Sequence, residues 1–246
     1  MIKIHYQGRL GNNMIQYFAG RILAEKSNLF LESNSRYDYW HKHFNIEPLN
    51  TKQIGTDIEY IYEENFLNIL EQQNLPIKCY ILQGFFQTKF FLHKYQKYIK
   101  NIFKIQYNDI DTKQVFVHYR IGDIENTRSM LPIEYYETAL SSIDCNSGYI
   151  ASDSINHPNI NQLHKKFNLI PINLSPIDTI HFGKNFNNLV LSEGTFSWWI
   201  GFLSKADTVV CNQRDYKWFG SDIFDFNNWQ KLNWDYDISN KTIQRP

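Results

Sequence analysis

Short apolar runs alternate with segments whose apolar residues recur at helical spacing along the first half of the chain. Residues 2–6 predict a strand, the glycines that follow predict a turn, and residues 12–26 predict a helix. Residues 29–31 predict a second strand, which would complete a βαβ unit with a parallel sheet. The segment 33–54 is polar, aromatic and irregular. Helices at 57–73 and 88–104 and a strand at 79–85 complete the predicted first half.

The second half follows a polar linker at 108–111 and alternates more regularly. The predicted strands are 115–118, 148–152, 169–172, 189–192 and 208–211, and the predicted helices are 132–143, 158–167, 177–186 and 196–204. This alternation is typical of βαβ crossovers in a doubly wound sheet. The tail, 215–246, has many aromatic residues and no clear period, so we expect it to wrap a surface. The pattern predicts an α/β protein with two facing Rossmann-like domains, 1–108 and 109–246.

The composition is that of a folded globular chain without a dominant charge. Of 246 residues, 43% are hydrophobic and 20% are charged, and 25 basic residues balance 25 acidic ones. No global field favours a nucleic acid or an anionic membrane, so we expect no nucleic-acid partner and local binding of any anionic ligand.

Targeting signals and cysteine spacing also bear on where the protein works. No apolar run approaches the roughly 18 residues that a membrane span needs, and the N-terminus lacks the apolar core of a secretory signal. Cys79, Cys145 and Cys211 lie far apart, without the spacing of a zinc site or a disulfide framework. We therefore expect a cytoplasmic protein, and peripheral attachment to the inner face of the membrane stays open.

Two motifs with candidate chemistry follow predicted strands. The segment 8–13 has two glycines, which let a ligand approach the backbone closely, and two amides that can bind a sugar. By itself, however, such a motif more often marks only a tight turn onto a helix. The segment 118–123 ends a strand that is otherwise apolar. Its Arg120 can clamp a phosphate through two charge-assisted hydrogen bonds, or can form a surface ion pair with Asp123 or Glu125.

Two further motifs occupy the same kind of position. Asp153, between two serines, could accept hydrogen bonds from a base or a ribose, or could form an Asx turn or a helix cap. The segment 193–199 predicts a helix start with Thr195 as its N-cap, and the free N–H groups of such a start suit a pyrophosphate. Adjacent tryptophans in a helix point to different sides, so we expect at least one of them to belong to the core.

Five motifs in this order resemble the bacterial α-1,2-fucosyltransferases, glycosyltransferase family 11. The motifs are Gly-Arg-Leu-Gly-Asn-Asn-Met-Ile-Gln-Tyr at 8–17, Gln-Gly-Phe-Phe-Gln at 83–87, 117–123, Ser152-Asp153 and Thr-Phe-Ser-Trp-Trp at 195–199. The resemblance spans nearly the whole chain, and Phe-Ser-Trp-Trp and His-x-Arg-x-Gly-Asp carry most of it. It implies a GT-B fold, GDP-fucose as donor substrate, no required metal or other cofactor, and inversion at the anomeric carbon.

The resemblance implies transfer of fucose to a hydroxyl of a glycan or surface-polysaccharide acceptor. Residues 1–108 would form the acceptor-side domain, and residues 109–246 the nucleotide-sugar-binding domain. Arg120 would stabilise the charge on the departing phosphate, and Asp123 is the nearest candidate for the general base. The donor-binding residues would be Gly11, Asn12, Asn13, His118, Asp153, Thr195, Phe196 and Ser197.

The chain departs from the family pattern at three places. Ile121 stands where the family has a second arginine, Ser154 replaces the second residue of an acidic pair, and Glu193-Gly194-Thr195 replaces Asn-Ser-Ser/Thr. These departures leave open a transferase that uses a different nucleotide sugar. A non-catalytic protein that binds a saccharide or a nucleotide is the alternative from another class.

Overall fold

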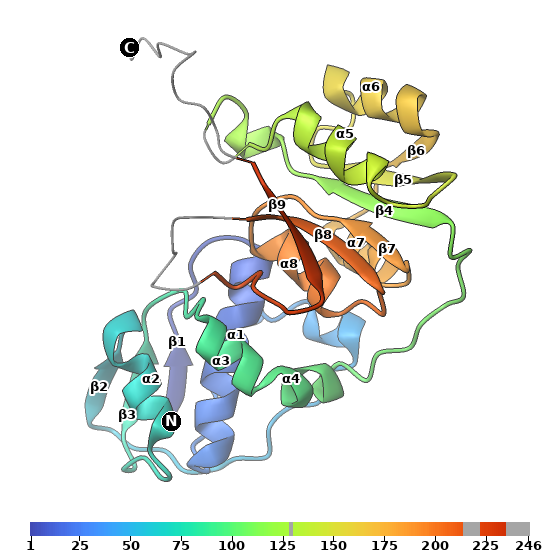
Figure 1. Cartoon of the computed structure of the whole chain (residues 1–246). Coiled ribbons are helices and arrows are strands. Elements are labelled where there is room, and N and C mark those ends of the chain that lie inside the picture. The colour runs from blue at the N-terminus through green and yellow to red at the C-terminus, as the bar shows by residue number, and fades with distance from the viewer. Residues whose placement is uncertain (128–129, 214–221, 235–246) are drawn as a thin grey trace.

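The computed structural model describes residues 1–127, 130–213 and 222–234, which form two sheets of parallel strands with helices around them (Figure 1). The smaller sheet has the order β1-β3-β2, with β1 (Ile2–Ile4), β2 (Ile58–Ile61) and β3 (Cys79–Leu82). The larger sheet has the order β6-β5-β4-β7-β8-β9, with β4 (Gln114–Tyr119), β5 (Ser147–Ser152), β6 (Leu169–Ile172), β7 (Asn188–Val190), β8 (Thr208–Gln213) and β9 (Trp229–Asn233). The predicted α/β class is confirmed.

The helices connect the strands in the order that the hydrophobic pattern predicts for most of the chain. They are α1 (Leu10–Lys26), α2 (Glu63–Glu71), α3 (Lys89–Lys94), α4 (Gln96–Ile102), α5 (Ile133–Ser141), α6 (Pro158–Phe167), α7 (Pro176–Gly183) and α8 (Thr195–Phe202), with 3-10 turns at His41–Phe44 and Gly122–Ile124. Local sequence sets several boundaries. Pro158 and Pro176 stand in first turns, where proline is favoured, and the Ser175 side chain accepts a hydrogen bond from the N–H of Asp178 at 3.2 Å.

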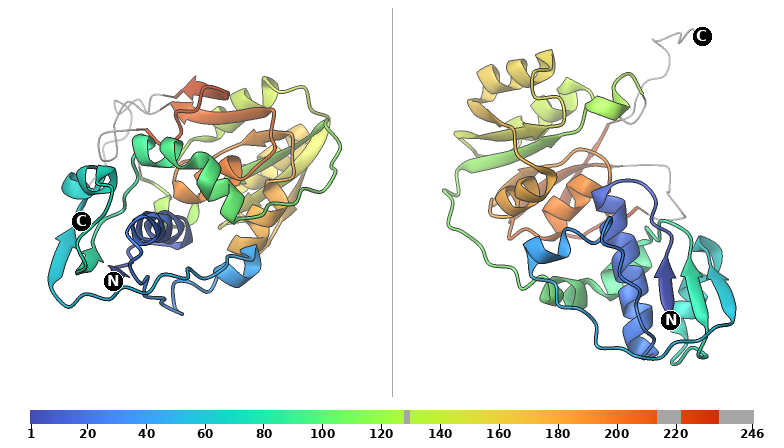
Figure 2. Two further views of the ribbon diagram at one scale, coloured as in Figure 1. Left: turned by 90° about the horizontal axis from the view of Figure 1, so that it is seen from below. Right: turned by 180° about the vertical axis from the view of Figure 1, so that it is seen from behind.

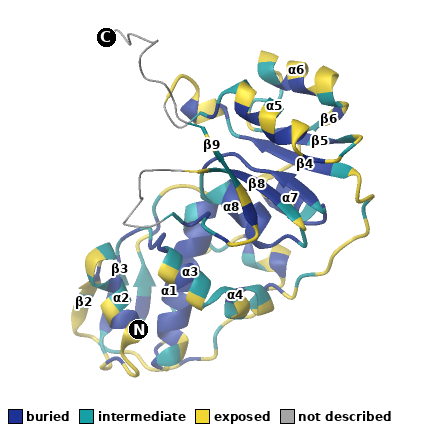
Figure 3. Ribbon diagram, viewed as in Figure 1, coloured by how far each residue is buried: buried dark blue, intermediate teal, exposed yellow. Residues whose placement is uncertain are grey.

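Side chains of β4 alternate between the two faces of the larger sheet. Val115 and Val117 belong to the core cluster that α5 and α6 cover, whereas Phe116 belongs to the cluster that includes α7 and α8. Figure 3 shows the outer surfaces of α5 and α6 as exposed and the strands beneath them as buried. His118, two residues after Phe116, therefore lies on the α8 side of the sheet.

Helices α1 and α8 join the two sheets through one continuous core. Trp199 Nε1 donates to the carbonyl oxygen of Gly11 at 2.9 Å, and the Trp199 ring lies 5.9 Å from that of Phe18. A Cβ at Gly11 would lie 2.6 Å from the backbone nitrogen of Phe196, so only glycine allows this close approach. The right-hand view of Figure 2 shows one end of α1 (blue) beside α8 (orange), and the two helices are in contact.

Four predicted elements differ from the structure. Residues 29–31 form only isolated bridges, to Ile2 and Gln53, so this run borders β1 without becoming a strand. The predicted helix at 57–73 begins as β2, because its β-branched and aromatic residues favour a strand, and the helix starts only at Glu63. The predicted helix at 88–104 is divided at Tyr95, where α3 ends and α4 begins. The tail contains a strand, β9, which its hydrophobic pattern did not predict because the pattern has no clear period.

Part of the tail contacts both halves of the molecule. The Trp198 indole donates to the carbonyl oxygen of Ile223 at 2.8 Å, and Phe226 stacks on His93 of α3 with ring centroids 4.4 Å apart. Residues 222–234 thus pack on both halves, and wrapping by the tail as a whole stays a prediction, because 215–221 and 235–246 lie outside the described residues. No helix in the described part of the chain is long and apolar enough to cross a membrane.

Candidate functional site

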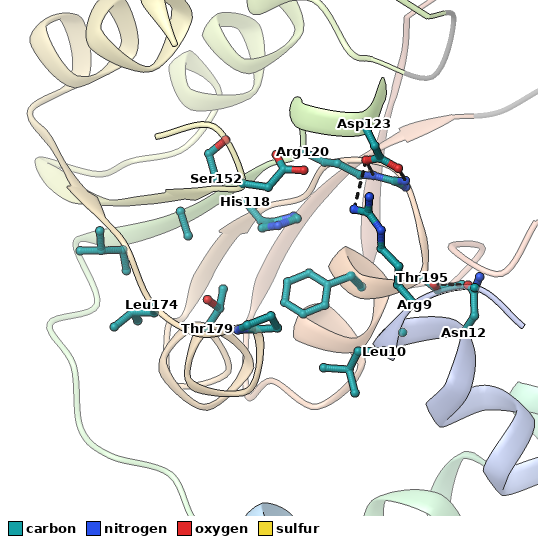
Figure 4. A pocket seen from close by; sticks show the side chains of 17 residues that line it. Arg9, Leu10, Asn12, His118, Arg120, Asp123, Ser152, Leu174, Thr179 and Thr195 are labelled. Atoms are coloured by element: carbon teal, nitrogen blue, oxygen red, sulfur yellow. Dashed lines mark hydrogen bonds and ion pairs between the residues drawn. The ribbon is translucent and has the colours of Figure 1, made fainter. Parts of the chain in front are cut away.

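A pocket of about 420 Å³ opens where the carboxyl ends of β4, β5 and β6 meet the N-terminal ends of α1 and α8 (Figure 4). This is the edge at which open α/β sheets bind ligands. The predicted site residues that line it are Gly11, Asn12, His118, Arg120, Asp123, Asp153, Thr195 and Phe196. Asn13 and Ser197 are not among the lining residues, so the structure brings together most, but not all, of the predicted set.

The charged end of the pocket is built around Asp123. Arg120 donates to both carboxylate oxygens, from Nε at 3.1 Å and from Nη2 at 2.8 Å. Hydrogen bonding by Arg120 is the main reason that the pKa of Asp123 lies below its usual value. Of the two ion pairs that the sequence allowed for Arg120, the one with Asp123 is present, whereas Glu125 lies 3.5 Å from His157 instead.

Arg9 is a second arginine at this end, which the sequence reasoning did not single out. Its Nη1 lies 3.3 Å from Asp123 Oδ1, and its side chain is 70% exposed. Arg9 comes from the loop before α1, so it reaches Asp123 from the opposite side of the pocket (Figure 4). Arg9 lies between the two glycines of the first motif, in a loop that was expected to approach a ligand. That position could have identified it as a site residue.

Gly194 lets the guanidinium of Arg120 lie against the backbone. A Cβ at this position would be 2.8 Å from Arg120 Nη1, and the backbone has a φ of 103°, which side chains disfavour. Gly194 is also the N-cap of α8, and Thr195 is the first helical residue. The prediction of Thr195 as N-cap is therefore wrong by one residue, because the turn needs a positive φ at the cap.

His118 is buried and neutral. Its Nδ1 contacts Ser197 Oγ, its ring lies 5.0 Å from that of Phe196, and burial lowers its pKa to about 4. Ser197 is itself fully buried. It therefore supports His118 from behind the pocket wall, which explains why it does not line the pocket. Trp198 and Trp199 are both fully buried in the core.

Asp153 shapes the loop that carries Arg120. Its Oδ1 accepts hydrogen bonds from the N–H groups of Ile121 at 2.8 Å and Gly122 at 3.1 Å. Ile121 is fully buried among the residues that pack under α5 and α6, so its side chain does not reach the pocket. Recognition of a base by Asp153 stays a prediction, and Oδ2 is the oxygen that this loop leaves available for it.

The two neighbouring asparagines have different surroundings. Asn13 is buried, and its Nδ2 donates to the carbonyl oxygen of Gln7 at 3.1 Å and to Gln16 Oε1 at 3.4 Å. It stabilises the loop before α1 and does not face the pocket, contrary to expectation, because one residue along a helix turns the side chain by about 100°. Asn12 does face the pocket, and its Oδ1 accepts from Thr195 Oγ1 at 2.6 Å.

The far end of the pocket is apolar. Ile172, Leu174 and Pro176 line it from the end of β6 and the start of α7. A second hollow, lined by the segment that follows β5, adjoins this end and shares Asp153 and Leu174 with it. The pocket can thus hold a ligand with an anionic group at one end and a flat, weakly polar group at the other.

Among the described residues, no group of three His, Cys, Asp or Glu side chains is arranged to hold a metal ion.

Comparison with known proteins does not assign the chain to a family. No model of a known protein family matches the sequence, and no curated protein matches it. The pocket and the order of the sequence motifs are thus the features of this protein that bear on its function.

Proposed function

We propose that this protein is an inverting glycosyltransferase of the GT-B type, which transfers fucose from GDP-fucose to a hydroxyl group of a saccharide acceptor. The observation that carries the proposal is one pocket with two arginines at one end and an apolar wall at the other. A nucleotide sugar needs both, because its diphosphate takes charge-assisted hydrogen bonds and its base packs on apolar groups. The order of the five motifs favours fucose as the sugar.

The reaction breaks the bond between the anomeric carbon and the β-phosphate oxygen, and that oxygen keeps the electron pair. The acceptor oxygen bonds to the opposite face of the carbon, so the configuration inverts. Arg120 and Arg9 would stabilise the charge on the departing phosphate, together with N–H groups at the start of α8 around Phe196 and Ser197. We expect no need for a divalent cation, because these groups supply the positive charge.

Asp123 has two roles in this proposal: it holds the arginines in the free protein, and it accepts a proton during the reaction. In the free protein it holds both arginines at the pocket, and its lowered pKa makes it a weak base. When the diphosphate draws the guanidinium groups away, the pKa of Asp123 rises toward its usual value. The carboxylate is then better able to accept the proton of the attacking hydroxyl.

A transferase with a different nucleotide sugar is the second candidate. It is favoured by the burial of Ile121, because no second arginine of the 118–123 motif reaches the pocket. Here the second cation comes from Arg9, on the other side of the ligand.

A panel of nucleotide sugars separates these candidates. The purified protein is incubated with each donor, with and without EDTA, and the released nucleotide is measured, with Arg120→Ala as the inactive control. Release of GDP from GDP-fucose alone, unchanged by EDTA, supports the proposal. Release from another donor supports the second candidate. Stabilisation by a nucleotide or saccharide without any release would contradict both and leave the non-catalytic protein.

A further inference from the structure

The side-chain oxygen of Asn12 receives two hydrogen bonds from distant parts of the chain. Gln87 Nε2 donates to it at 3.0 Å and Thr195 Oγ1 at 2.6 Å. Asn12 lies in the first turn of α1, Gln87 follows β3, and Thr195 begins α8. One oxygen atom therefore ties the smaller sheet to the helix at the edge of the pocket.

These two bonds fix the orientation of the Asn12 amide. An amide has one acceptor oxygen and one NH₂ group with two donors. Since the oxygen is engaged by Gln87 and Thr195, the NH₂ group is the part of this amide that is still free to donate. Within the described part of the chain, Asn12 Nδ2 has no protein partner. A Cβ at Gly8 would lie 2.1 Å from this nitrogen, so Gly8 leaves the room that the NH₂ group occupies.

Gln87 is itself held by an unusual turn. Phe86, the preceding residue, is fully buried and has a φ of 55°, a conformation that bulky residues rarely adopt. The N–H groups of Phe85 and Phe86 both donate to the Glu63 carboxylate, the latter at 2.9 Å. Gln16 Nε2 donates to the carbonyl oxygen of Gly84 at 2.9 Å. Strained turns of this kind persist where the surrounding contacts over-determine them, and they gather at functional sites.

We infer that Gln87 is a positioning residue, which orients the Asn12 amide so that its NH₂ group donates to the diphosphate of the ligand. Gln87 is 7% exposed and does not line the pocket, so it acts only through Asn12. The inference depends on the proposed function for the identity of the ligand. The orientation of Asn12 by Gln87 stands independently of it.

Three substitutions test the inference by kinetics. Gln87→Leu removes the donor at similar size and should lower kcat/KM about 10-fold, to the level of Asn12→Ala. Gln87→Glu places a second acceptor against the Asn12 oxygen, so the amide should turn its NH₂ group away from the pocket and activity should fall further. In the Asn12→Ala background, Gln87→Leu should have no further effect on kcat/KM, because the residue it positions is gone.

Asn185→Leu is the matched control. It removes a buried amide at the far end of α7 that contacts neither Asn12 nor the turn of Gln87, so its effects on stability and on kcat/KM should simply add to those of Asn12→Ala. Additive effects of Gln87→Leu and Asn12→Ala would overturn the inference. Thermal denaturation measured in parallel shows whether each variant is folded.

A readout without catalysis separates the inference from the proposed function. In ¹⁵N-labelled protein, the side-chain NH₂ signals of Asn12 should move toward those of a free amide in Gln87→Leu and stay in place in Asn185→Leu. Unmoved signals in Gln87→Leu overturn the inference even if the protein is an active transferase. Moved signals in a protein that turns over no nucleotide sugar leave the orientation established and overturn the proposed function alone.

Discussion

Arg9 and Asp123 come from opposite sides of the pocket, and their charged groups lie 3.3 Å apart. Both guanidinium groups at this end, Arg9 and Arg120, are thus kept in place by a single carboxylate. A ligand diphosphate would replace that carboxylate with a stronger, doubly charged partner. Under the proposed function, an anionic ligand would therefore exchange one set of ion pairs for another.

The first prediction concerns Arg9. Arg9→Ala should weaken GDP binding about 10-fold, or about 1.4 kcal/mol, and guanosine binding hardly at all, because guanosine has no phosphate. The loss of GDP affinity in Arg9→Ala should be smaller at high salt, since the Arg9 side chain is exposed and salt screens its charge. Calorimetric titration of both ligands measures this. Arg36→Ala, at an exposed arginine outside the pocket, is the control. Equal losses for GDP and guanosine would contradict the assignment.

The second prediction concerns Arg120. Arg120→Ala should lower kcat by about 10²–10³ while the protein stays folded, because one preorganised donor to the departing phosphate is lost. Arg120→Lys should restore activity only partly, since lysine cannot donate in the planar two-bond geometry that Asp123 now accepts. Steady-state kinetics measure kcat of both variants against the wild type, and circular dichroism shows whether each variant is folded. A near-normal kcat in Arg120→Ala is incompatible with the proposed mechanism.

The third prediction separates the base from the phosphates. At a hundredfold excess over Kd, GDP should stabilise the native protein by about 2.7 kcal/mol. Asp153→Asn keeps an acceptor for the loop N–H groups but replaces Oδ2 with a donor, so it should weaken GDP more than UDP or ADP.

Thr195→Val provides the contrast to Asp153→Asn. It removes the hydroxyl bound to Asn12 and should weaken all three nucleotides alike. Thermal shifts with each nucleotide give the comparison. Equal losses across the three nucleotides in Asp153→Asn would remove Asp153 from base recognition.

The fourth prediction is a pH dependence of stability. The pKa of His118 is lowered from 6.5 to about 4 in the folded protein, so the unfolded chain binds a proton there first as the pH falls. Stability should therefore decrease between pH 6.5 and 4, by roughly 3 kcal/mol from this residue. Denaturant unfolding at several pH values should show a smaller decrease in His118→Gln. His5→Gln, at an exposed position, should follow the wild type, and a His118→Gln curve parallel to the wild type would contradict the prediction.

Sequence periodicity predicted the larger sheet well and the smaller one less well. In the second half, long apolar strands such as β4 are buried on both faces and are flanked by amphipathic helices, so the pattern is strong. In the first half, β2 is an edge strand whose Ile58 and Tyr60 are exposed, and no alternation marks it. Strand β9 was missed for a similar reason, because it too is an edge strand, at one end of the larger sheet.

The site was predictable where a motif follows a strand, and less so where side chains act across space. Arg120, Asp123, His118 and Asp153 were found because the ends of neighbouring parallel strands meet at one edge of the sheet. The direction of Asn13 depends on the phase of the helix, in which adjacent side chains differ by about 100°, and the sequence motif alone did not show which of Asn12 and Asn13 faces the pocket. The pairing of Arg9 with Asp123 depends on how the two halves face each other, and no local pattern encodes that.

The contact of Gly11 with α8 makes the linker at 108–111 a connection within one folding unit. Phe18 and Phe103, from the first half, pack on Trp199 of the second half. A fragment cut at the linker would expose these rings to water, at a cost of several kcal/mol for the pair of fragments. The pocket therefore exists only in the intact chain, because Arg9 and Asn12 come from the first half and Arg120 and Asp153 from the second.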